Sequence, residues 1–498
     1  MQRTVVSLDA IAGRGGPVRS APSGKAGGGS ACASACGGAS RSAKELPPDV
    51  QAKIAEHPCY SAEAHHYFAR MHVAVAPACN IQCHYCNRKY DCANESRPGV
   101  VSERLDPERA VAKVLAVAAE MPQLSVVGIA GPGDALANPK ATFETFEGIA
   151  AALPDIKLCL STNGLALPDH VDAIKKLDIS HVTVTLNAID PDIAAKIYPW
   201  VSFERKRWTG RAAAEILLAR QREGIAALVA AGVLVKINSV LIPGVNDDHL
   251  VEVNAEVRRW GVFLHNIMPL ISDPAHGTHF GLTGQRGPTP SELKTLQDRL
   301  GGDAALMKHC RQCRADAVGM LGEDRHADFA KDDAATAPPE VDPVKRRVYR
   351  RLVERERADR AAASAEAATL LAAAASDESL LVAVCTRGSG RVNQHFGHAA
   401  EFQVYEVDRD GVRLVGHRRA GRYCQGGDGD DDALEQTIAA LDGISVVLAA
   451  KIGRCPMERL AEAGITVFED FAGQYIEPAA AAAYRAVTAE ERAVARSA

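Results

Sequence analysis

The sequence predicts an α/β protein made of two unequal units, a partial (β/α)6 barrel and a smaller C-terminal α/β domain. Two observations predict this fold class. Short apolar runs alternate with segments of helical period from residue 71 to residue 271, as the strands and crossover helices of a parallel sheet do. A second, shorter alternation starts at residue 380. Six strand–helix units are fewer than a closed eight-fold barrel needs, so we expect a partial barrel.

The expected strands of the first unit are runs rich in β-branched and apolar residues. In chain order they are MHVAVAP from residue 71, LSVVGIAG at 124–131, KLCLSTNG at 157–164, HVTVTLN at 181–187, LVKINSVLI at 234–242 and FLHNIMPLI at 263–271. Helices are expected over 106–121, near 140–152, from Pro168, over 211–231 and from Asp247. The first of these begins with a capping Asp106 followed by Pro107, which suits a helix start. We expect the site at the carboxyl ends of the strands.

The C-terminal unit has its own pattern of strands and helices. Strands are expected at 380–386, 402–407, 412–418 and 444–450, with helices near 432–441 and 456–463. Residues 323–345 carry charge, Pro and Ala without a periodic apolar face, and 345–375 form an Ala- and Arg-rich helix that we interpret as a solvated linker. A basic face on that helix leaves contact with a partner open.

The expected division of the chain has four parts. Residues 1–45 are rich in Gly, Ala and Ser and form a disordered tail, in which Cys32 and Cys36 are interpreted as incidental thiols. Residues 46–325 form the first domain, 326–378 a partly helical linker, and 379–498 the second domain.

Composition excludes some classes of protein. The chain has 498 residues, a formal net charge of −5 and 47% hydrophobic residues, so it can bury a large core and has no strongly basic domain for a nucleic acid. No uncharged apolar run is long enough for a membrane span, and we see no secretory signal. Thirteen unevenly spaced cysteines in such a chain favour metal ligation over disulfides. The expected location is a reducing cytoplasm.

The most informative motif is a cysteine triplet. Cys79, Cys83 and Cys86 have the spacing C-x3-C-x2-C, with Tyr85 before the last cysteine. Three thiolates can hold three irons of a [4Fe–4S] cluster and leave the fourth iron open to a ligand. A zinc knuckle or a chance cluster is the alternative. The triplet resembles the signature of radical S-adenosylmethionine (SAM) enzymes, in which the open iron binds the amino and carboxylate groups of SAM.

The radical SAM resemblance implies polar SAM contacts at successive strand ends. GPGD at 131–134 resembles a GGE-type segment that meets the methionine amine, and PGVN at 243–246 resembles an adenine-contacting stretch. Alone, each segment is typical of an ordinary turn. The expected SAM-binding residues are Gly131, Gly133, Asp134, Ser161, Thr162, Asn163, Asn187, Ile242 and Gly244.

A longer sequence segment indicates one particular family among the radical SAM proteins. Residues 57–101 combine an HPC entry, the triplet, a further DC pair and ESRPGV, and resemble the NifB family, radical SAM proteins that build the iron–sulfur core of the nitrogenase cofactor. The resemblance covers roughly residues 46–325. It implies two further [4Fe–4S] substrate clusters, so three clusters in all. One is held by Cys59, Cys92 and Cys159, and the other by His66, Cys310 and Cys313.

Glu95 and Arg97 lie next to Cys92 in the ESRPGV segment. The resemblance makes Glu95 a proton carrier and Arg97 an anion or cluster contact in catalysis. A salt-bridged loop is the alternative interpretation.

The same resemblance implies a lyase-type reaction with methyl transfer and carbide insertion. One SAM gives a methyl group to a cluster sulfide, and a second SAM yields a radical that abstracts hydrogen from it. The carbon becomes a central carbide as two cubes and a further sulfide fuse into the eight-iron precursor of the iron–molybdenum cofactor. Expected partners are an iron–sulfur cluster donor scaffold, downstream carrier and assembly proteins of nitrogenase, and a reductant such as ferredoxin or flavodoxin. No nucleic-acid or membrane partner is expected.

The C-terminal unit resembles a different family. The run VNQHFGHA at 392–399 is similar to the NifX/NafY family, ribonuclease-H-like domains that carry nitrogenase cofactor precursors. His395, His398, Cys424 and Cys455 are candidate cluster contacts, although a histidine in such a turn is more often a local hydrogen-bonding group.

Two other functions remain open from the sequence. One is a radical SAM enzyme that acts on a peptide or metabolite, with auxiliary clusters that only transfer electrons. The other is a non-catalytic iron–sulfur scaffold or carrier, which would not cleave SAM when reduced.

Overall fold

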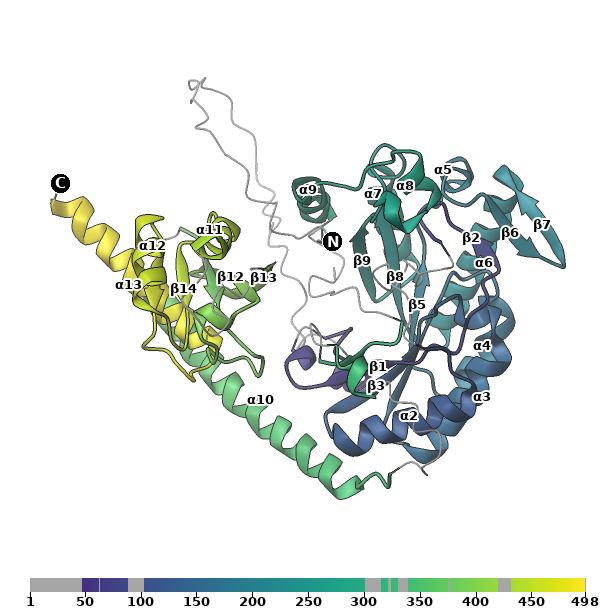
Figure 1. Ribbon diagram of the computed structural model, residues 1–498, viewed down its shortest axis with the longest axis horizontal. Helices are drawn as coiled ribbons and strands as arrows, with labels where there is room; N and C mark the ends of the chain where they lie inside the picture. Colours follow the sequence, from purple (N-terminus) through teal and green to yellow (C-terminus); the bar gives the residue numbers. More distant parts are fainter. Residues whose placement is uncertain are drawn as a thin grey trace, which may run out of the picture.

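The computed structural model describes residues 47–61, 63–87, 103–300, 315–320, 324–329, 339–374, 376, 378–419 and 431–497. The main body is a curled sheet with helices on its outer side, and one long helix leads from it to a smaller sheet domain (Figure 1). Cys92, Glu95, Arg97, Cys310, Cys313 and Cys424 lie outside the described residues.

The large sheet has seven strands in the order β10-β1-β3-β4-β5-β8-β9. Six of them run parallel and β10 pairs antiparallel with β1, so the (β/α)6 partial barrel is confirmed. The bounds are β1 Ala69–His72, β3 Leu124–Ile129, β4 Lys157–Thr162, β5 His181–Thr185, β8 Leu234–Leu241, β9 Leu264–Pro269 and β10 Val318–Gly319.

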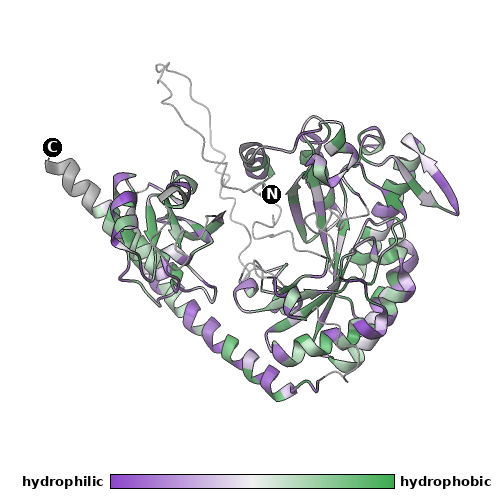
Figure 2. Cartoon of the chain, in the orientation of Figure 1, coloured by the Kyte–Doolittle hydropathy of each residue, from purple (hydrophilic) through white to green (hydrophobic). Residues whose placement is uncertain are grey.

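Helices between these strands cover the outer face of the sheet. They are α2 Pro107–Glu120, α3 Pro139–Ala152, α4 Val171–Lys176, α6 Gly210–Ala230, α7 His249–Arg259 and α9 Pro290–Leu300. The predicted N-cap is present: the Asp106 carboxylate accepts the Arg109 amide at 2.8 Å. Apolar side chains of helices and strands, such as Val114, Phe146 and Leu160, form one core between them. In Figure 2 the strands are correspondingly green and the outer helix faces purple.

The inner face of the sheet is polar, unlike the apolar filling of closed eight-fold barrels. Alternate residues of β4, β5, β8 and β9 point away from the outer core. These inward side chains are at most 9% exposed and include Ser161, Asn163, Thr183, Thr185, Asn187, Lys236, Asn238 and Asn266. We call this inner side of the barrel the lumen. Its polarity favours a charged or polar occupant over packing alone.

Short elements around the barrel were not predicted. They are α1 Pro48–Ile54, η3 Ala64–His66, β2 Ile81–Gln82, η4 Ala135–Ala137, α5 Pro191–Ala195, β6 Trp200–Phe203, β7 Lys206–Thr209, η6 Pro274–His276, α8 His279–Leu282 and η7 His326–Phe329. The β6–β7 hairpin turns at Glu204 and Arg205, both at positive φ. That pair is not the Asn-Gly or Asp-Gly turn that predicts a two-residue hairpin. The helix expected from Pro168 begins instead as the 3-10 turn η5, Leu167–His170.

The helix expected over 345–375 is confirmed as α10, Pro343–Ala372, and most of it is exposed as in a solvated linker, but part of its basic face is not. Arg346 is 2% exposed and donates to the Asp155 carboxylate at 2.8 Å and to the Leu124 carbonyl at 2.7 Å. Arg350 binds Glu56 at 3.0 Å. Part of the basic face of α10, for which contact with a partner was considered, therefore binds acidic residues of the barrel and holds the helix against it.

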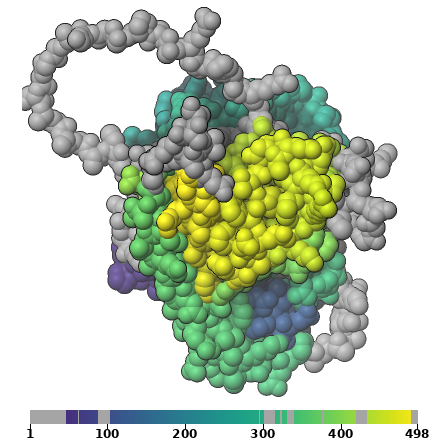
Figure 3. All heavy atoms as spheres, turned by 90° about the vertical axis from the view of Figure 1, so that its left-hand side faces the viewer, coloured from purple at the N-terminus to yellow at the C-terminus, as the bar shows by residue number. Residues whose placement is uncertain are grey.

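The other half of α10 packs against the C-terminal domain. Arg360 pairs with Glu477 at 2.5 Å in a mostly buried site. The Tyr475 hydroxyl donates to Glu356 at 2.8 Å, and Arg391 donates to the same carboxylate at 3.0 Å. Figure 3 shows the green helix alongside the yellow domain. Charge complementarity along one helix thus joins the two units.

The C-terminal domain is the mixed α/β unit that the pattern predicts. Its sheet has the order β13-β12-β11-β14-β15, antiparallel in the first three strands and parallel from β11 to β15. Its elements are β11 Leu380–Val384, η8 Phe396–His398, β12 Glu401–Asp408, β13 Gly411–Arg419, α11 Asp431–Ala440, β14 Val446–Leu448, α12 Arg454–Glu462, β15 Thr466–Phe468 and α13 Ile476–Ser497. Helix α13, which was not predicted, buries an alanine-rich face ending at Tyr484 in the core.

Candidate functional site

The loop Cys79–Cys86 lies at the carboxyl end of the barrel, just beyond β1. Its residues 81 and 82 form β2, which pairs antiparallel with β6, and the Ser202 amide donates to the Asn80 carbonyl at 2.7 Å. Cys83 is buried, whereas Cys79 and Cys86 are partly exposed, and none of the three is in a disulfide. The hairpin of β6 and β7 therefore braces the predicted cluster loop from outside.

Amide side chains fix the loop from within. Gln82 donates to the carbonyls of Cys83 and Cys86 at 3.0 and 2.9 Å. Asn163 Nδ2 lies 3.7 Å from Cys79 Sγ and also donates to the Asn80 side chain at 2.7 Å. A donor directed at a cysteine sulfur is what thiolate ligands of iron–sulfur clusters commonly receive.

The predicted segment 131–134 reaches the same loop through its backbone. The Gly133 amide donates to the Ala76 carbonyl at 2.7 Å, and the Asp134 amide donates to the Ala78 carbonyl at 2.8 Å. A Cβ atom on Gly133 would lie 2.2 Å from the Ala78 oxygen, so only glycine allows this approach.

The Asp134 carboxylate ties the ends of β3 and β4 together. It accepts the Thr162 hydroxyl at 3.1 Å and the Asn163 amide at 2.5 Å, in addition to two amides of η4. Burial raises the pKa of Asp134, and these hydrogen bonds partly offset the shift. Asp134 therefore positions Asn163, whereas its own contact with SAM stays a prediction.

Asn187 forms a second network below the cluster loop. Its fully buried side chain donates to the hydroxyls of Tyr85 and Tyr198 at 2.7 and 2.9 Å and accepts the Val240 amide at 2.7 Å. Burial raises the pKa of Tyr198, so this phenol stays protonated. The aromatic residue before the last cysteine is thus anchored to the end of β5.

The segment after β8 completes this end of the barrel. The Asn246 side chain accepts the Ile242 amide at 2.8 Å and donates to the carbonyls of Asn187 and Val240 at 3.0 and 2.9 Å. Gly244 has a φ of 75°, which suits glycine. Asn246 was quoted in the motif but was not among the predicted SAM contacts.

Cys59 and Cys159 both lie toward the opposite, amino end of the lumen. Cys159 on β4 is in register with His181, the first residue of β5, and His181 is in register with Leu234, the first residue of β8. Cys59 packs on the apolar group that includes Leu234. Two cysteines one hundred positions apart are thus near the same strand ends, which is not the carboxyl end where we expected the whole site.

His66 is buried in η3, also before β1, with its ring 3.9 Å from that of His65 between centroids. A Cβ atom on Gly388 would lie 3.8 Å from the His66 carbonyl, so a loop of the C-terminal domain borders this turn. The other predicted members of both cluster sets lie outside the described residues, and the two ligand sets stay predictions.

Within the described ranges, no three His, Cys, Asp or Glu side chains converge as the ligands of a single metal ion would. A cube takes one thiolate at each of its irons, so its ligands stand further apart than those of one ion. None of the helices in the described part of the chain is long and apolar enough to cross a membrane.

In the C-terminal domain, His395 caps its own turn: its Nδ1 accepts the Gly397 amide at 3.0 Å. The ring of His398 lies 4.8 Å from that of His395, and Cys455 is exposed in the first turn of α12. The local hydrogen-bonding interpretation of His395 is observed, and a cluster contact there stays a prediction. Burial raises the pKa of Cys385, so this thiol stays protonated.

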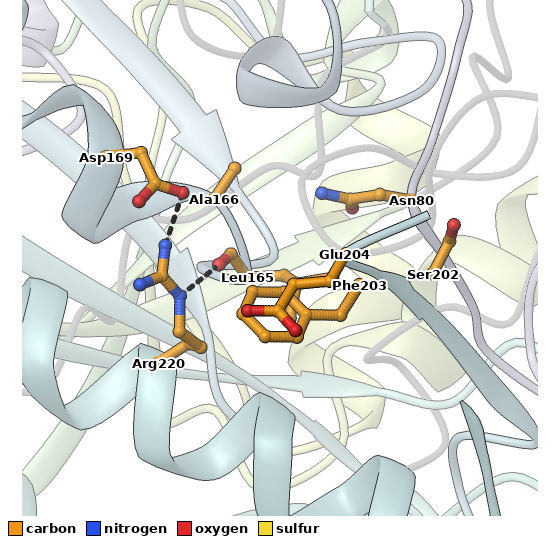
Figure 4. A pocket seen from close by; sticks show the side chains of 8 residues that line it. All are labelled: Asn80, Leu165, Ala166, Asp169, Ser202, Phe203, Glu204 and Arg220. Carbon is orange, nitrogen blue, oxygen red and sulfur yellow. Dashed lines mark hydrogen bonds and ion pairs between the residues drawn. The ribbon is translucent and has the colours of Figure 1, made fainter. Parts of the chain in front are cut away.

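A surface pocket of about 410 Å³ lies behind Asn80 (Figure 4). Arg220 crosses it, donating to the Leu165 carbonyl at 3.0 Å and pairing with Asp169. Phe203 and Glu204 of the hairpin close the far side.

Three lumen residues were missed by sequence reasoning: His57, His181 and Lys236. For His181 and Lys236 the signal is the polar alternation in HVTVTLN and LVKINSV, since a strand buried on both faces has a continuous apolar run instead.

These features define a radical SAM protein: a partial barrel whose cysteine loop follows the first strand. The radical SAM superfamily model matches residues 73–256, and the model described as dinitrogenase iron-molybdenum cofactor matches 378–486. The FeMo cofactor biosynthesis protein NifB of Rhodobacter capsulatus is 62% identical over 451 residues, which cover 90% of this chain and 100% of that protein. NifB of Azotobacter vinelandii is 53% identical over 468 residues, covering 92% and 93%. The chain belongs to the NifB family.

Proposed function

We propose that this radical SAM enzyme fuses two [4Fe–4S] clusters, with a SAM-derived carbide and a further sulfide, into the eight-iron precursor of the nitrogenase iron–molybdenum cofactor. The observation that carries the proposal is the pair of cysteine sites at the two ends of one polar lumen. A radical SAM site at one end and thiols at the other suit a reaction whose substrates are themselves clusters.

The residues present fit a resident cluster at the carboxyl end. Cys79, Cys83 and Cys86 lie on one braced loop, and Asn163 directs an N–H at the Cys79 sulfur. When bound and reduced, a [4Fe–4S] cluster supplies the electron that cleaves SAM. Asp134 and Asn187 hold the donor groups and Tyr85 in place, so the loop does not reorganise when SAM binds.

The amino end suits the substrate clusters. Cys59 and Cys159 supply thiols beside a buried basic region, and Cys92 joins them in the proposed set. The polar lumen between the ends lets an anionic cube lie inside the barrel without burying its charge against apolar walls. His66 with Cys310 and Cys313 forms the second proposed set.

The proposed chemistry uses SAM twice. One SAM transfers its methyl group to a sulfide of a bound cube, and the radical from a second SAM abstracts hydrogen from that methyl. The two remaining hydrogens of that carbon leave as protons, and the cluster irons and the reductant supply the electrons as the carbon becomes the central carbide of the fused cubes. The reducing electrons come from a small donor of the ferredoxin or flavodoxin class. A cluster scaffold delivers the cubes, and downstream carriers of the nitrogenase pathway remove the product.

The test is anaerobic reconstitution with iron and sulfide, followed by dithionite and SAM. We expect about twelve irons per chain, for three cubes, and both S-adenosylhomocysteine and 5′-deoxyadenosine. About four irons with 5′-deoxyadenosine alone would overturn the proposal in favour of an ordinary radical SAM enzyme. Twelve irons without either nucleoside would indicate a carrier.

A further inference from the structure

Three ring-bearing residues and a lysine form a compact group at the amino end of the lumen, which we call the basic floor: His57, Tyr60, His181 and Lys236. The His57 and His181 rings are 4.2 Å apart between centroids, and Tyr60 lies 4.6 Å from each. Lys236 Nζ lies 5.7 Å from the Tyr60 ring. All four side chains are at most 5% exposed, so the group is inside the protein.

His57 presents a hydrogen-bond donor that the protein does not use. Its Nδ1 accepts the Cys59 amide at 3.3 Å, which places the ring proton on Nε2. Within the described ranges, the buried Nε2 atom has no hydrogen-bond partner. Nε2 of His181 also has no hydrogen-bond partner within these ranges, and its Nδ1 contacts the Ser180 hydroxyl at 2.9 Å, a contact in which either group can donate. Buried polar nitrogens of this kind are rarely left without a partner.

The charge around these donors has one sign. The charged neighbours with the largest effects on the pKa of His57 are all bases: His181, Lys236, Lys157 and His72. Burial and then nearby lysines lower the pKa of His181, and the Lys53 carbonyl partly offsets this. A buried N–H group without an acceptor calls for one, and the lysine beside it favours an acceptor that is anionic.

The thiols of the proposed substrate site border the floor. Cys59 follows His57 by two residues and bonds to its ring through the backbone, and Cys159 is in register with His181. The floor residues come from the HPC segment, β5 and β8, so three separate elements direct basic groups toward the space next to the two cysteines. This arrangement arises from the fold and not from one local motif.

We propose that His57, His181 and Lys236 cradle the sulfide face of the anionic [4Fe–4S] cube held by Cys59 and Cys159. This inference rests on the proposed function. A cube with thiolate ligands carries net negative charge, and its bridging sulfides accept N–H hydrogen bonds. The cradle therefore stabilises the reduced, more negative form and raises the reduction potential of this cube relative to one without such donors.

The test compares Lys236→Met with the charge-conserving Lys236→Arg in the full chain. After anaerobic reconstitution, iron is counted and each cluster's electron paramagnetic resonance signal is followed in a redox titration. We expect Lys236→Met to shift one cubane signal to lower potential and leave the other signals in place. Lys236→Arg should keep that signal close to its wild-type potential. Unchanged potentials for every cluster in Lys236→Met would overturn the cradle.

A second variant guards against misfolding of the first. His181→Phe keeps a ring against His57 and Tyr60 while it removes the unpartnered Nε2 atom, and a thermal melt reports whether the fold persists. We expect a folded protein in which the same cubane signal moves to lower potential. A folded His181→Phe protein with wild-type potentials would also contradict the cradle.

Cys159→Ser separates failure of the cradle from failure of the proposed function. Loss of about four irons in this variant, with unchanged potentials in Lys236→Met, would reject the cradle and keep the cluster site. No loss of iron in Cys159→Ser would reject the cluster site itself. Competition by inorganic phosphate at the floor, seen as slower cluster loading in wild type but not in Lys236→Met, would identify a general anion site and reject cube specificity.

Discussion

The two ends of the barrel lumen satisfy their polar groups in different ways. At the carboxyl end, Asp134, Asn163, Asn187 and Asn246 bond to one another's strands, and each has several partners within the protein. At the amino end, the Nε2 atoms of His57 and His181 have no hydrogen-bond partner among the described residues. A hydrogen-bond network whose groups are all satisfied within the protein keeps its geometry before a ligand binds. A network with unsatisfied groups is instead completed by the ligand.

This difference indicates two kinds of occupant. Rigid geometry suits a cofactor that stays in place and must meet SAM the same way in every turnover. Histidine nitrogens without a partner, next to a lysine, suit a substrate that is bound, altered and released. The division agrees with the proposal that the carboxyl end cleaves SAM and the amino end holds a substrate cube.

The largest expected effect comes from removing one cysteine thiol at each end of the lumen, in two separate variants. Cys83→Ala should abolish 5′-deoxyadenosine formation, because the loop loses the buried member of its three proposed cluster ligands. Cys159→Ala should retain reductive SAM cleavage and lose about four irons. Product analysis by chromatography with iron counts gives both results. Equal loss of 5′-deoxyadenosine in the two variants would mean that the ends do not act separately.

Asp134→Asn should have the next largest effect, on the carboxyl end alone. The amide is not an anionic acceptor, and it weakens a charge-assisted bond of the kind worth about 1.5–3 kcal/mol, so Asn163 loses its fixed position. We expect a 10- to 100-fold fall in the rate of SAM cleavage with full iron content. Asp169→Asn, at an exposed carboxylate on the outer surface, is the matched control. A rate within twofold of wild type in Asp134→Asn would show that the network is not needed.

The clamp of α10 on the barrel gives a smaller, pH-dependent effect. Burial raises the pKa of Asp155, but Arg346 and Arg350 outweigh it and hold the pKa below 3.8. The carboxylate therefore contributes stability above pH 3.8, and that contribution is lost as the pH falls through the lowered pKa. Asp155→Ala leaves the buried Arg346 without this partner, and because Asp155 is partly exposed we expect a cost of only about 1–2 kcal/mol.

Denaturant unfolding of wild type and Asp155→Ala at several pH values measures this contribution. The difference in unfolding free energy should be constant near neutrality and shrink below pH 3.8. Glu354→Ala, on the exposed side of α10, serves as the control with little expected effect. A difference in unfolding free energy that grows as the pH falls would contradict a lowered pKa for Asp155.

The sequence predicted the parallel strands and the cysteine loop because both leave local patterns. The strand KLCLSTNG and the triplet ending in Cys86 are contiguous in the chain. The basic floor could not be predicted in this way, since His57, His181 and Lys236 meet only after three elements pack. The role of α10 was predicted only in part because its arginines find partners such as Asp155 and Glu56 from distant segments. A run of charged residues in a sequence indicates an exposed surface only where the fold brings no residue of opposite charge against it.

The smallest expected effect tests the outer limit of the carboxyl-end site. The pocket behind Asn80 adjoins the cluster loop but lies outside the lumen, and Arg220 fills it with bonds to Leu165 and Asp169 (Figure 4). Arg220→Met removes an ion pair whose Asp169 side chain is mostly exposed, so loss of the pair should cost less than about 1 kcal/mol in a thermal melt. SAM cleavage should remain within twofold of wild type, because no lumen group loses a partner. A tenfold loss of SAM cleavage with full iron content would mean that this pocket belongs to the SAM site. The hydrogen-bond network at the carboxyl end would then also need a ligand to complete it.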